Sequence, residues 1–107
     1  MLIVGFLLLL SFPMFAQLQP TEIKVIDAEN GNSIEFAAVQ WKGLNAPTYT
    51  NGTTTNRKGI AKLSASSNQK LMLMVSYVGY QTITDTITAN GKRYTIRLTR
   101  NQHSWQM

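Results

Sequence analysis

The sequence predicts an all-β domain, and three observations favour a sandwich of six or seven short strands. First, residues 71–80 read Leu-Met-Leu-Met-Val-Ser-Tyr-Val-Gly-Tyr, with apolar side chains on both phases of a two-residue repeat. A strand of this kind is expected to be covered on both faces. Second, turn-forming residues separate the extended segments, and third, no stretch after residue 16 offers three turns of amphipathic helix. A five-stranded OB-type barrel is the alternative architecture.

The expected strands follow one another closely along the chain. They are residues 22–27, 34–42, 59–63, 71–78, 81–88 and 94–99, with a short extended stretch at 53–55 inside a long surface loop, 44–58. Asn30-Gly31 and Asn90-Gly91 are expected to form tight reversals, because these residues tolerate the positive φ angles that such turns require. The second pair is interpreted as a hairpin. Gly79 is expected to mark a bend or a close approach of backbone.

Alternation within the last two strands predicts which side chains face the core. Tyr94, Ile96 and Leu98 are expected to point inward, with polar residues between them pointing outward. Asp85 interrupts the preceding strand between two isoleucines. Either a bulge shifts the register there or Asp85 lies near a sheet edge.

Residues 1–16 are almost entirely apolar, and polar residues begin at Gln17. As a helix this run spans about 24 Å, and it is shorter than the ~20 residues that a membrane helix usually needs. We interpret it as a cleavable secretory signal, with Ala16 as the small residue before the cut. A buried N-terminal helix and a retained membrane anchor are the alternatives. Residues 17–21 then form a linker.

Length and composition indicate one small domain. Removal of the signal from the 107-residue chain leaves 91 residues, which we divide into a domain at 22–100 and a tail at 101–107. The chain has no cysteine, so packing alone must hold an exported domain together. The same absence excludes a lipidated cysteine, thiol catalysis and thiolate metal sites.

The net charge of +5 favours anionic partners only in a general electrostatic way. Most basic residues are scattered singly, as expected for the solvated face of alternating strands. A nucleic-acid groove would interleave basic residues with exposed stacking aromatics, and an exported protein seldom meets that ligand. We therefore expect no nucleic-acid partner.

The sequence predicts no enzymatic activity. A catalytic zinc site usually takes three protein ligands that include histidine, whereas this chain has one histidine and five dispersed carboxylates. His103 lies in the aperiodic tail and is expected to be solvated. Ser76 lies on a strand expected to be buried, with no base nearby to activate it. We predict no catalytic residue, no metal ligand and no cofactor.

Aromatic residues are the candidates for a partner or ligand surface. Tyr77 and Tyr80 lie on either side of Val78-Gly79 and are expected to pack at a strand end, with a sugar-stacking or partner-docking surface as the alternative for both. Trp41 is expected in the core, with partial exposure as the alternative, and Tyr49 lies in the long loop. Trp105 has no evident core to enter, so docking onto the sandwich and contact with a neighbouring partner both stay open. The surface candidates are Trp41, Tyr49, Tyr80 and Trp105.

Five segments in one order resemble the carboxypeptidase regulatory-like domain. They are Ile23-Lys24-Val25-Ile26-Asp27, Asn30-Gly31, residues 34–39, residues 52–59 and Val75-Ser76-Tyr77-Val78-Gly79-Tyr80. The resemblance covers residues 22 to about 99 and implies a seven-stranded transthyretin-like (prealbumin-like) Greek-key β-sandwich. Asn56 and Ile60 depart from the family pattern, where Asp and Phe are usual. Because Asn also caps turns, the turn should survive, while a bound cation is less expected.

The resemblance also implies a setting. Such domains often stand after the signal peptide of TonB-dependent outer-membrane receptors, including the SusC type that imports glycans. We therefore expect a non-catalytic accessory domain, either the N-terminal extension or a truncated fragment of such a receptor. It is expected to be exported to the periplasm or outer membrane of a Gram-negative bacterium, and its partner is the rest of a receptor or another envelope protein. The alternative is a free-standing secreted module that uses the 44–58 loop to bind a glycan or a protein.

Overall fold

The computed structural model describes residues 20–65 and 68–101, and these residues form seven strands without a helix. The strands are β1 (Thr21–Asp27), β2 (Ala38–Gly43), β3 (Asn51–Thr54), β4 (Ile60–Leu63), β5 (Lys70–Ser76), β6 (Ile83–Thr88) and β7 (Arg93–Leu98). The all-β prediction is confirmed. In the described part of the chain, no helix is long and apolar enough to cross a bilayer. The predicted signal at 1–16 and the tail from residue 102 lie outside the described residues.

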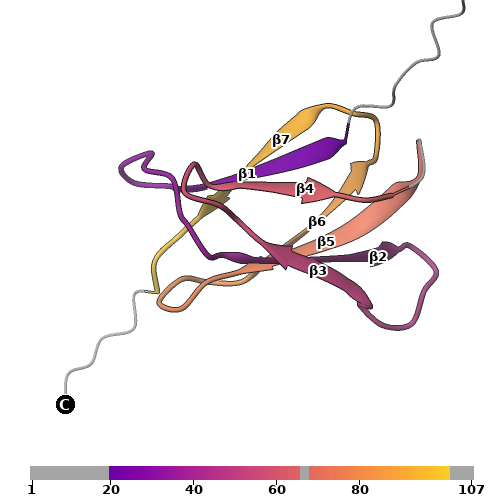
Figure 1. The fold of residues 1–107 in the computed structure, drawn as a ribbon. Helices are drawn as coiled ribbons and strands as arrows, with labels where there is room; N and C mark the ends of the chain where they lie inside the picture. The colour runs from indigo at the N-terminus through magenta and orange to yellow at the C-terminus, as the bar shows by residue number, and fades with distance from the viewer. Residues whose placement is uncertain (1–19, 66–67, 102–107) are drawn as a thin grey trace, which may run out of the picture.

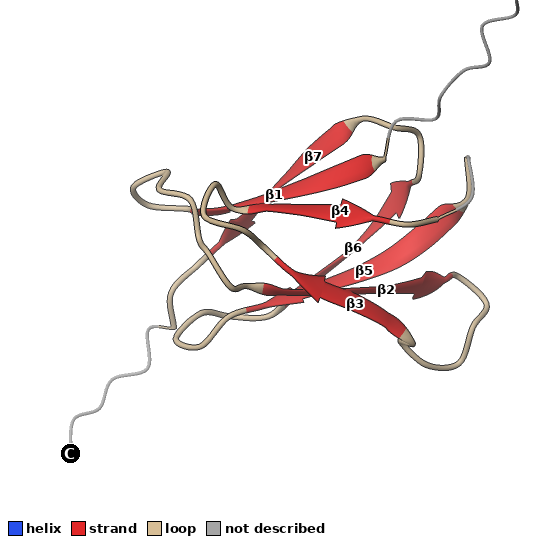
Figure 2. Ribbon diagram, in the orientation of Figure 1, coloured by secondary structure: helices blue, strands red, loops and turns tan. Residues whose placement is uncertain are grey.

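The strands are arranged in two layers that face each other (Figure 1). One sheet has the order β4-β1-β7, and the other has the order β3-β2-β5-β6. β1 pairs antiparallel with β4 and parallel with β7, while all neighbours in the second sheet are antiparallel. The β2–β3 and β5–β6 connections are hairpins, and the remaining connections cross between the layers (Figure 2). This is the Greek-key sandwich that the sequence predicted.

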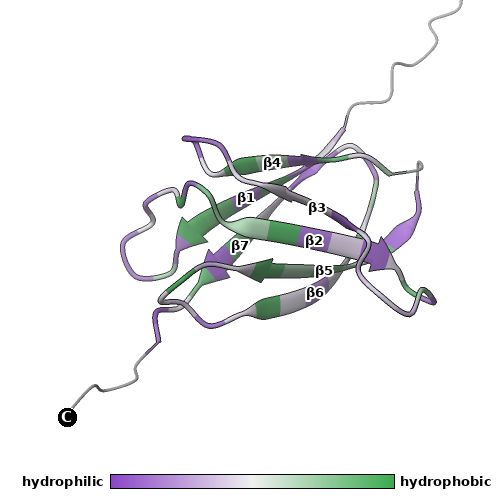
Figure 3. Cartoon of the chain, turned by 60° about the horizontal axis from the view of Figure 1, so that its bottom comes forward, coloured by the Kyte–Doolittle hydropathy of each residue, from purple (hydrophilic) through white to green (hydrophobic). Residues whose placement is uncertain are grey.

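A closed apolar core lies between the sheets. Ile23 and Val25 on β1 and Leu73 and Val75 on β5 have no exposed surface. Figure 3 shows the underlying pattern, in which hydrophobic segments of the strands alternate with hydrophilic ones. Each Val, Leu or Ile side chain removed from water in this way stabilises the fold by about 1.5–3 kcal/mol. The inward positions predicted for β7 are confirmed, since Ile96 and Leu98 are buried and Tyr94 packs against the core.

The strand expected at 34–42 begins later than predicted. After β1 the chain reverses at the Asn30-Gly31 turn, and Ser33 forms an isolated antiparallel bridge back to Ile26. It then passes through a turn and enters the second sheet only at Ala38. The physical reason is the backbone of Phe36, whose φ of 67° is incompatible with an extended strand. Periodicity alone does not reveal such a break.

Only one face of β5 is fully buried, whereas the sequence predicted that both faces would be covered. Its inward residues are fully buried, but Met72 and Met74 on the other phase are only half-buried. The expectation that this strand is covered on both faces is therefore wrong for the described residues. Because methionine is a flexible apolar residue, it is tolerated on a face of this kind.

The neighbouring strand β6 settles two further expectations. It pairs continuously with β5 from Ile83 to Thr88, and it is the last strand of its sheet. The interruption at Asp85 therefore reflects a sheet edge and not a bulge. The Asn90-Gly91 turn is present, but it joins β6 to β7 in the opposite sheet. The hairpin expected there is wrong, because hydrogen bonds from Gly91 and Glu22 tie this turn to the start of β1.

Candidate functional site

Among the described residues, an apolar hollow lies at one end of the four-stranded sheet. Five residues line it: Phe36, Ala38, Ser76, Tyr77 and Val78. It is a shallow depression, open to solvent, with a volume of about 480 Å³. Two large apolar side chains are exposed at its rim, with 66% of Phe36 and 84% of Val78 accessible to solvent. We call this feature the Phe36 hollow.

A buried threonine fixes the backbone around Phe36. The Thr55 hydroxyl donates to the Ile34 carbonyl at 2.7 Å and accepts from the Ala37 N–H at 2.9 Å. The Thr55 carbonyl accepts from the Phe36 N–H at 3.0 Å. These bonds hold Phe36 in a left-handed conformation that costs a bulky residue roughly 1–3 kcal/mol. The Phe36 ring is mostly exposed, so packing within the domain does not offset the cost of this strained backbone.

The opposite rim of the hollow is a tight turn from Tyr77 to Tyr80. The Tyr80 N–H donates to the Tyr77 carbonyl at 3.0 Å, and Gly79 has a φ of 87°. These features place Val78 at the tip of the turn. A Cβ added at Gly79 would meet no atom within 4 Å, so this position needs glycine for its φ angle alone. Of the two expected reasons for this glycine, the bend is confirmed and the close approach is wrong.

A buried carboxylate anchors this turn to the other sheet. The Tyr80 hydroxyl donates to Asp27 Oδ2 at 2.6 Å, and Arg100 Nε donates to the same oxygen at 3.2 Å. The N–H groups of Glu29 and Asn30 donate to Asp27 Oδ1 at 2.7 and 3.2 Å. Each carboxylate oxygen thus accepts two hydrogen bonds, which meets the requirement for burying a charge. The Asp27 carboxylate is fully engaged in holding the end of β1, the turn and the residues after β7 together.

The same contacts fix the charge state of the cluster. The Tyr80 hydroxyl holds the pKa of Asp27 well below its usual value, the N–H groups of Glu29 and Asn30 and the Arg100 guanidinium act in the same direction, and burial opposes them. The hydrogen bond to the Asp27 carboxylate in turn raises the pKa of Tyr80. Asp27 is therefore charged and Tyr80 neutral at ordinary pH. Because this ionised carboxylate is already fully hydrogen-bonded, it is suited to holding the surrounding segments in position.

Three of the four predicted surface aromatics lie in the described part of the chain, and they do not lie together. Trp41 is a core residue with 4% exposure, so its ring is not available to a ligand. Tyr49 lies in the loop after β2, where the Lys42 ammonium sits 5.2 Å from its ring centre. Tyr80 lies at the other end of the same sheet, with its ring 5.9 Å from that of Tyr77. Trp105 and the other tail candidate, His103, lie outside the described residues.

The sequence indicates Tyr77 as a possible docking residue, but it does not reveal the two exposed residues of the hollow, Phe36 and Val78. Its alternation places Phe36 inside a strand and Val78 in a strand covered on both faces. Two features could have revealed them. Gly79 directly follows Val78 and indicates a tight turn, and Thr55 is a buried polar residue that faces the start of β2. Ser76 does lie on β5 as expected, but it is half-buried at the hollow and not enclosed in the core.

The turn before β4 behaves as predicted despite its substitution. The Asn56 side-chain oxygen accepts from the N–H groups of Lys58 at 2.8 Å and of Ile60 at 3.1 Å. Asn therefore closes this turn without a carboxylate. Among residues 20–65 and 68–101, no group of three His, Cys, Asp or Glu side chains is arranged to hold a metal ion.

The fold defines a β-sandwich module with an apolar hollow at one end of one sheet. Residues 24–107 match the family described as CarboxypepD_reg-like domain, and the chain belongs to this family. Its members are non-catalytic, regulatory-like domains. No curated protein sequence matches the chain. Among solved structures, the Bacillus anthracis TIE protein is similar with a TM-score of 0.60 and 20% identity, covering 77% of this chain. The chain spans 17% of that protein, and the likeness shows the fold alone.

Proposed function

We propose that this chain is the exported N-terminal accessory domain of a TonB-dependent outer-membrane uptake receptor of the SusC type, or derives from one. The observation that carries the proposal is the order of segments. A signal-like apolar run at 1–16 is followed, after a linker of five residues, by a CarboxypepD_reg-like domain. In this proposal the domain binds a partner and positions it, whereas the rest of the receptor carries out the transport. Its location is the periplasmic side of the outer membrane.

The geometry suits a domain placed in line between two other segments. Thr21 starts β1 next to Leu63 and the 90–92 turn, whereas Asn101 lies at the opposite end of the sandwich. There the Asn101 N–H donates to the Gly79 carbonyl at 2.9 Å, one residue from Val78. A following receptor domain would therefore emerge beside the Phe36 hollow. We propose that this following domain covers the hollow and contacts the exposed Phe36 and Val78 side chains.

A free-standing secreted binding module is the second candidate. The observation in its favour is the pair of aromatic rings, Phe36 and Tyr77, at the hollow, because sugars and apolar peptide side chains both stack on such rings. In this case the occupant would be a glycan or a protein of the envelope. The hollow would take the role that the sequence assigned to the 44–58 loop.

One experiment in the organism of origin separates these candidates. The complete coding region is tagged at its 3′ end, and cells are fractionated with and without residues 1–16. Recovery of the tag in the outer membrane, on a product long enough to include a plug and barrel, supports the receptor. A short product found only in the medium contradicts it and favours the secreted module. A product that stays in the cytoplasm with residues 1–16 present contradicts both.

The role of the hollow is tested in the same product. Phe36→Ser/Val78→Ser should open the contact with the following domain and expose the linker after residue 101 to protease. Tyr49→Ser, at the far end of the sheet, is the matched control and should leave cleavage unchanged. Equal cleavage of both variants and the wild type would show that the hollow is not covered by that domain.

A further inference from the structure

The outward face of the three-stranded sheet collects positive charge that looks scattered in the sequence. Alternate residues of β1, β4 and β7 are buried, so the others point outward. The outward residues are Glu22, Lys24, Ile26, Ile60, Lys62, Arg93, Thr95 and Arg97. Four of these eight residues are basic and one is acidic, which gives this surface a net charge of +3. We call it the basic face.

The strand register determines how these charges are distributed. Glu22 lies between Lys62 on one side and Arg93 on the other, and its carboxylate pairs with Arg93 at 2.9 Å. Lys24 lies in the next row, and its ammonium donates to a backbone carbonyl, that of Lys58. Across the described residues, Arg97 and Lys62 have no ion pair with a carboxylate. The single acid therefore leaves most of the charge uncompensated.

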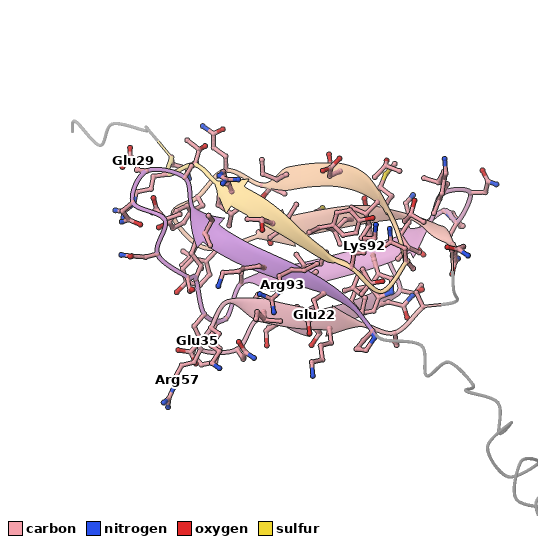
Figure 4. The ribbon with its side chains drawn as sticks, turned by 90° about the horizontal axis from the view of Figure 1, so that it is seen from above. Glu22, Glu29, Glu35, Arg57, Lys92 and Arg93 are labelled. Carbon is pink, nitrogen blue, oxygen red and sulfur yellow. The ribbon has the colours of Figure 1, made fainter. Side chains whose placement is uncertain are left out.

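The remaining carboxylates lie away from this face. Asp27 is buried in its cluster with Tyr80 and Arg100, and Asp85 is on β6 of the other sheet. Glu29 and Glu35 lie in the turns beyond the end of β1, as the view onto the basic face shows (Figure 4). In the same view Glu22 and Arg93 lie over the sheet, and Lys92 lies at the end where β1 and β7 begin. The basic face thus carries four of the ten basic residues and a net charge of +3, out of the +5 of the whole chain.

The shape and composition of the basic face select one class of partner. Neighbouring strands lie about 4.8 Å apart and alternate residues about 7 Å apart, so the cations form a grid on a pleated surface. A planar anionic surface can meet all of them at once. A single-stranded nucleic acid would instead need a groove with stacking aromatics, and the outward set contains none. Ile26 and Ile60, both half-buried, lie among the cations.

We propose that the basic face rests against an anionic lipid leaflet. Each Lys or Arg near such a surface contributes through the attraction of anionic headgroups, and this attraction weakens with salt. The contact would orient the sandwich with its strands along the membrane and leave the Phe36 hollow free at one end. This proposal goes beyond the receptor assignment, because it requires only that the domain meets a membrane.

The test is binding of the full chain to vesicles of phosphatidylglycerol mixed with phosphatidylcholine, compared with phosphatidylcholine alone. Residues 1–16 contribute to both, so the difference between the two lipids is the readout. Lys24→Gln/Arg97→Gln should weaken binding to the anionic vesicles about 25-fold, from roughly fivefold for each residue. Lys42→Gln/Lys70→Gln is the matched control, with the same net charge change on the opposite sheet, and should change binding by less than about threefold. Thermal unfolding of both variants verifies that they fold.

Three outcomes would overturn the proposal. Equal weakening by both double variants would mean that net charge, and not the basic face, governs binding. Binding to anionic vesicles that does not fall between 50 and 300 mM salt would assign it to residues 1–16. Tight, variant-sensitive binding to dextran sulfate without any preference for anionic vesicles would identify a soluble polyanion as the partner. None of these results bears on whether the receptor assignment is correct.

Discussion

At the scale of single residues, Asp27 and Phe36 are the side chains whose surroundings carry the most information. Asp27 is a charge held inside the protein, and Phe36 is an apolar ring held outside it. Both depend on hydrogen bonds between segments that are far apart in the sequence. For each residue, the structure therefore predicts whether a substitution raises or lowers the stability of the domain.

Asp27 should make the stability of the domain sensitive to acid. Its pKa is depressed below the ordinary 3.8 in the folded state, so its stabilising contribution is present at neutral pH and is lost as the pH falls below about 4. Urea unfolding at pH 7, 5 and 3 should show a steep loss of stability between the last two. Asp27→Asn should be less stable at pH 7 and should lose less between pH 5 and 3. A parallel loss in both proteins would contradict the assignment.

Tyr80→Phe isolates the hydroxyl of the same cluster. It removes a hydrogen bond to a charged group, and should lower the free energy of unfolding by about 1.5–3 kcal/mol. Tyr94→Phe is a suitable control, because the Tyr94 hydroxyl donates to a neutral carbonyl, that of Thr88, and its loss should cost about 1 kcal/mol. Urea denaturation at pH 7 measures both.

Phe36→Gly should stabilise the domain, by about 1 kcal/mol, because glycine adopts the observed positive φ without strain. Phe36→Ala removes the same ring but keeps the strain, so it should not stabilise. If Phe36 serves a partner, the glycine variant should gain stability and lose binding together. A glycine variant less stable than the alanine variant would show that the ring contributes to packing.

At the scale of elements, Gly59 sets how closely the turn before β4 approaches β1. Its φ is 76°, and an added Cβ would lie 2.7 Å from the Val25 carbonyl oxygen. The Gly59 carbonyl also accepts from the Val25 N–H at 2.8 Å. The contact fixes β4 beside β1, and neither the turn nor the strand can move without breaking the pairing.

Gly59→Ala should therefore destabilise the domain by about 3 kcal/mol, from backbone strain and overlap together. Gly79→Ala introduces the strain without the overlap and should cost about 1–2 kcal/mol. Chemical denaturation of the two variants checks the difference. Equal losses would mean that the turn before β4 shifts to accept the new methyl group.

The edge strand β6 is guarded by Asp85. Asp85 is paired with Leu73 in the strand register, so it occupies a position whose side chain would face the core, yet Asp85 is exposed. A charge at such a place discourages pairing with another chain. Asp85→Val should leave the monomer folded but promote association, seen by light scattering at rising protein concentration, whereas Thr84→Val on the outward phase should do so less.

At the scale of the whole molecule, charge and apolar exposure are separated on the surface. The basic face covers the three-stranded sheet, and the Phe36 hollow lies at one end of the four-stranded sheet. Two distinct contacts could therefore be made at once, one with a charged surface and one with an apolar partner. This separation follows from the two-layer fold, which gives each sheet its own outward face.

The sequence predicted much of this fold because its signals are local. Alternation marked β1, β5 and β7 and their inward residues, and turn residues marked where strands end. It failed at Phe36, whose conformation depends on hydrogen bonds between Thr55 and its neighbours Ile34 and Ala37, which are 21 and 18 residues away from Thr55 in the sequence. For Trp41 the sequence favoured a core position and left partial exposure open, and its 4% exposure confirms the core position.

The order of apolar and polar residues thus determined by itself that this chain forms strands and encloses a hydrocarbon core, since side-chain alternation is a property of neighbouring residues. Only the tertiary structure decided the parallel pairing of β1 with β7, the joining of Asp27 to Arg100 across 73 residues, and the gathering of scattered cations on one face. The physical reason is that these arrangements depend on which strands become neighbours, and long-range pairing has no local signature.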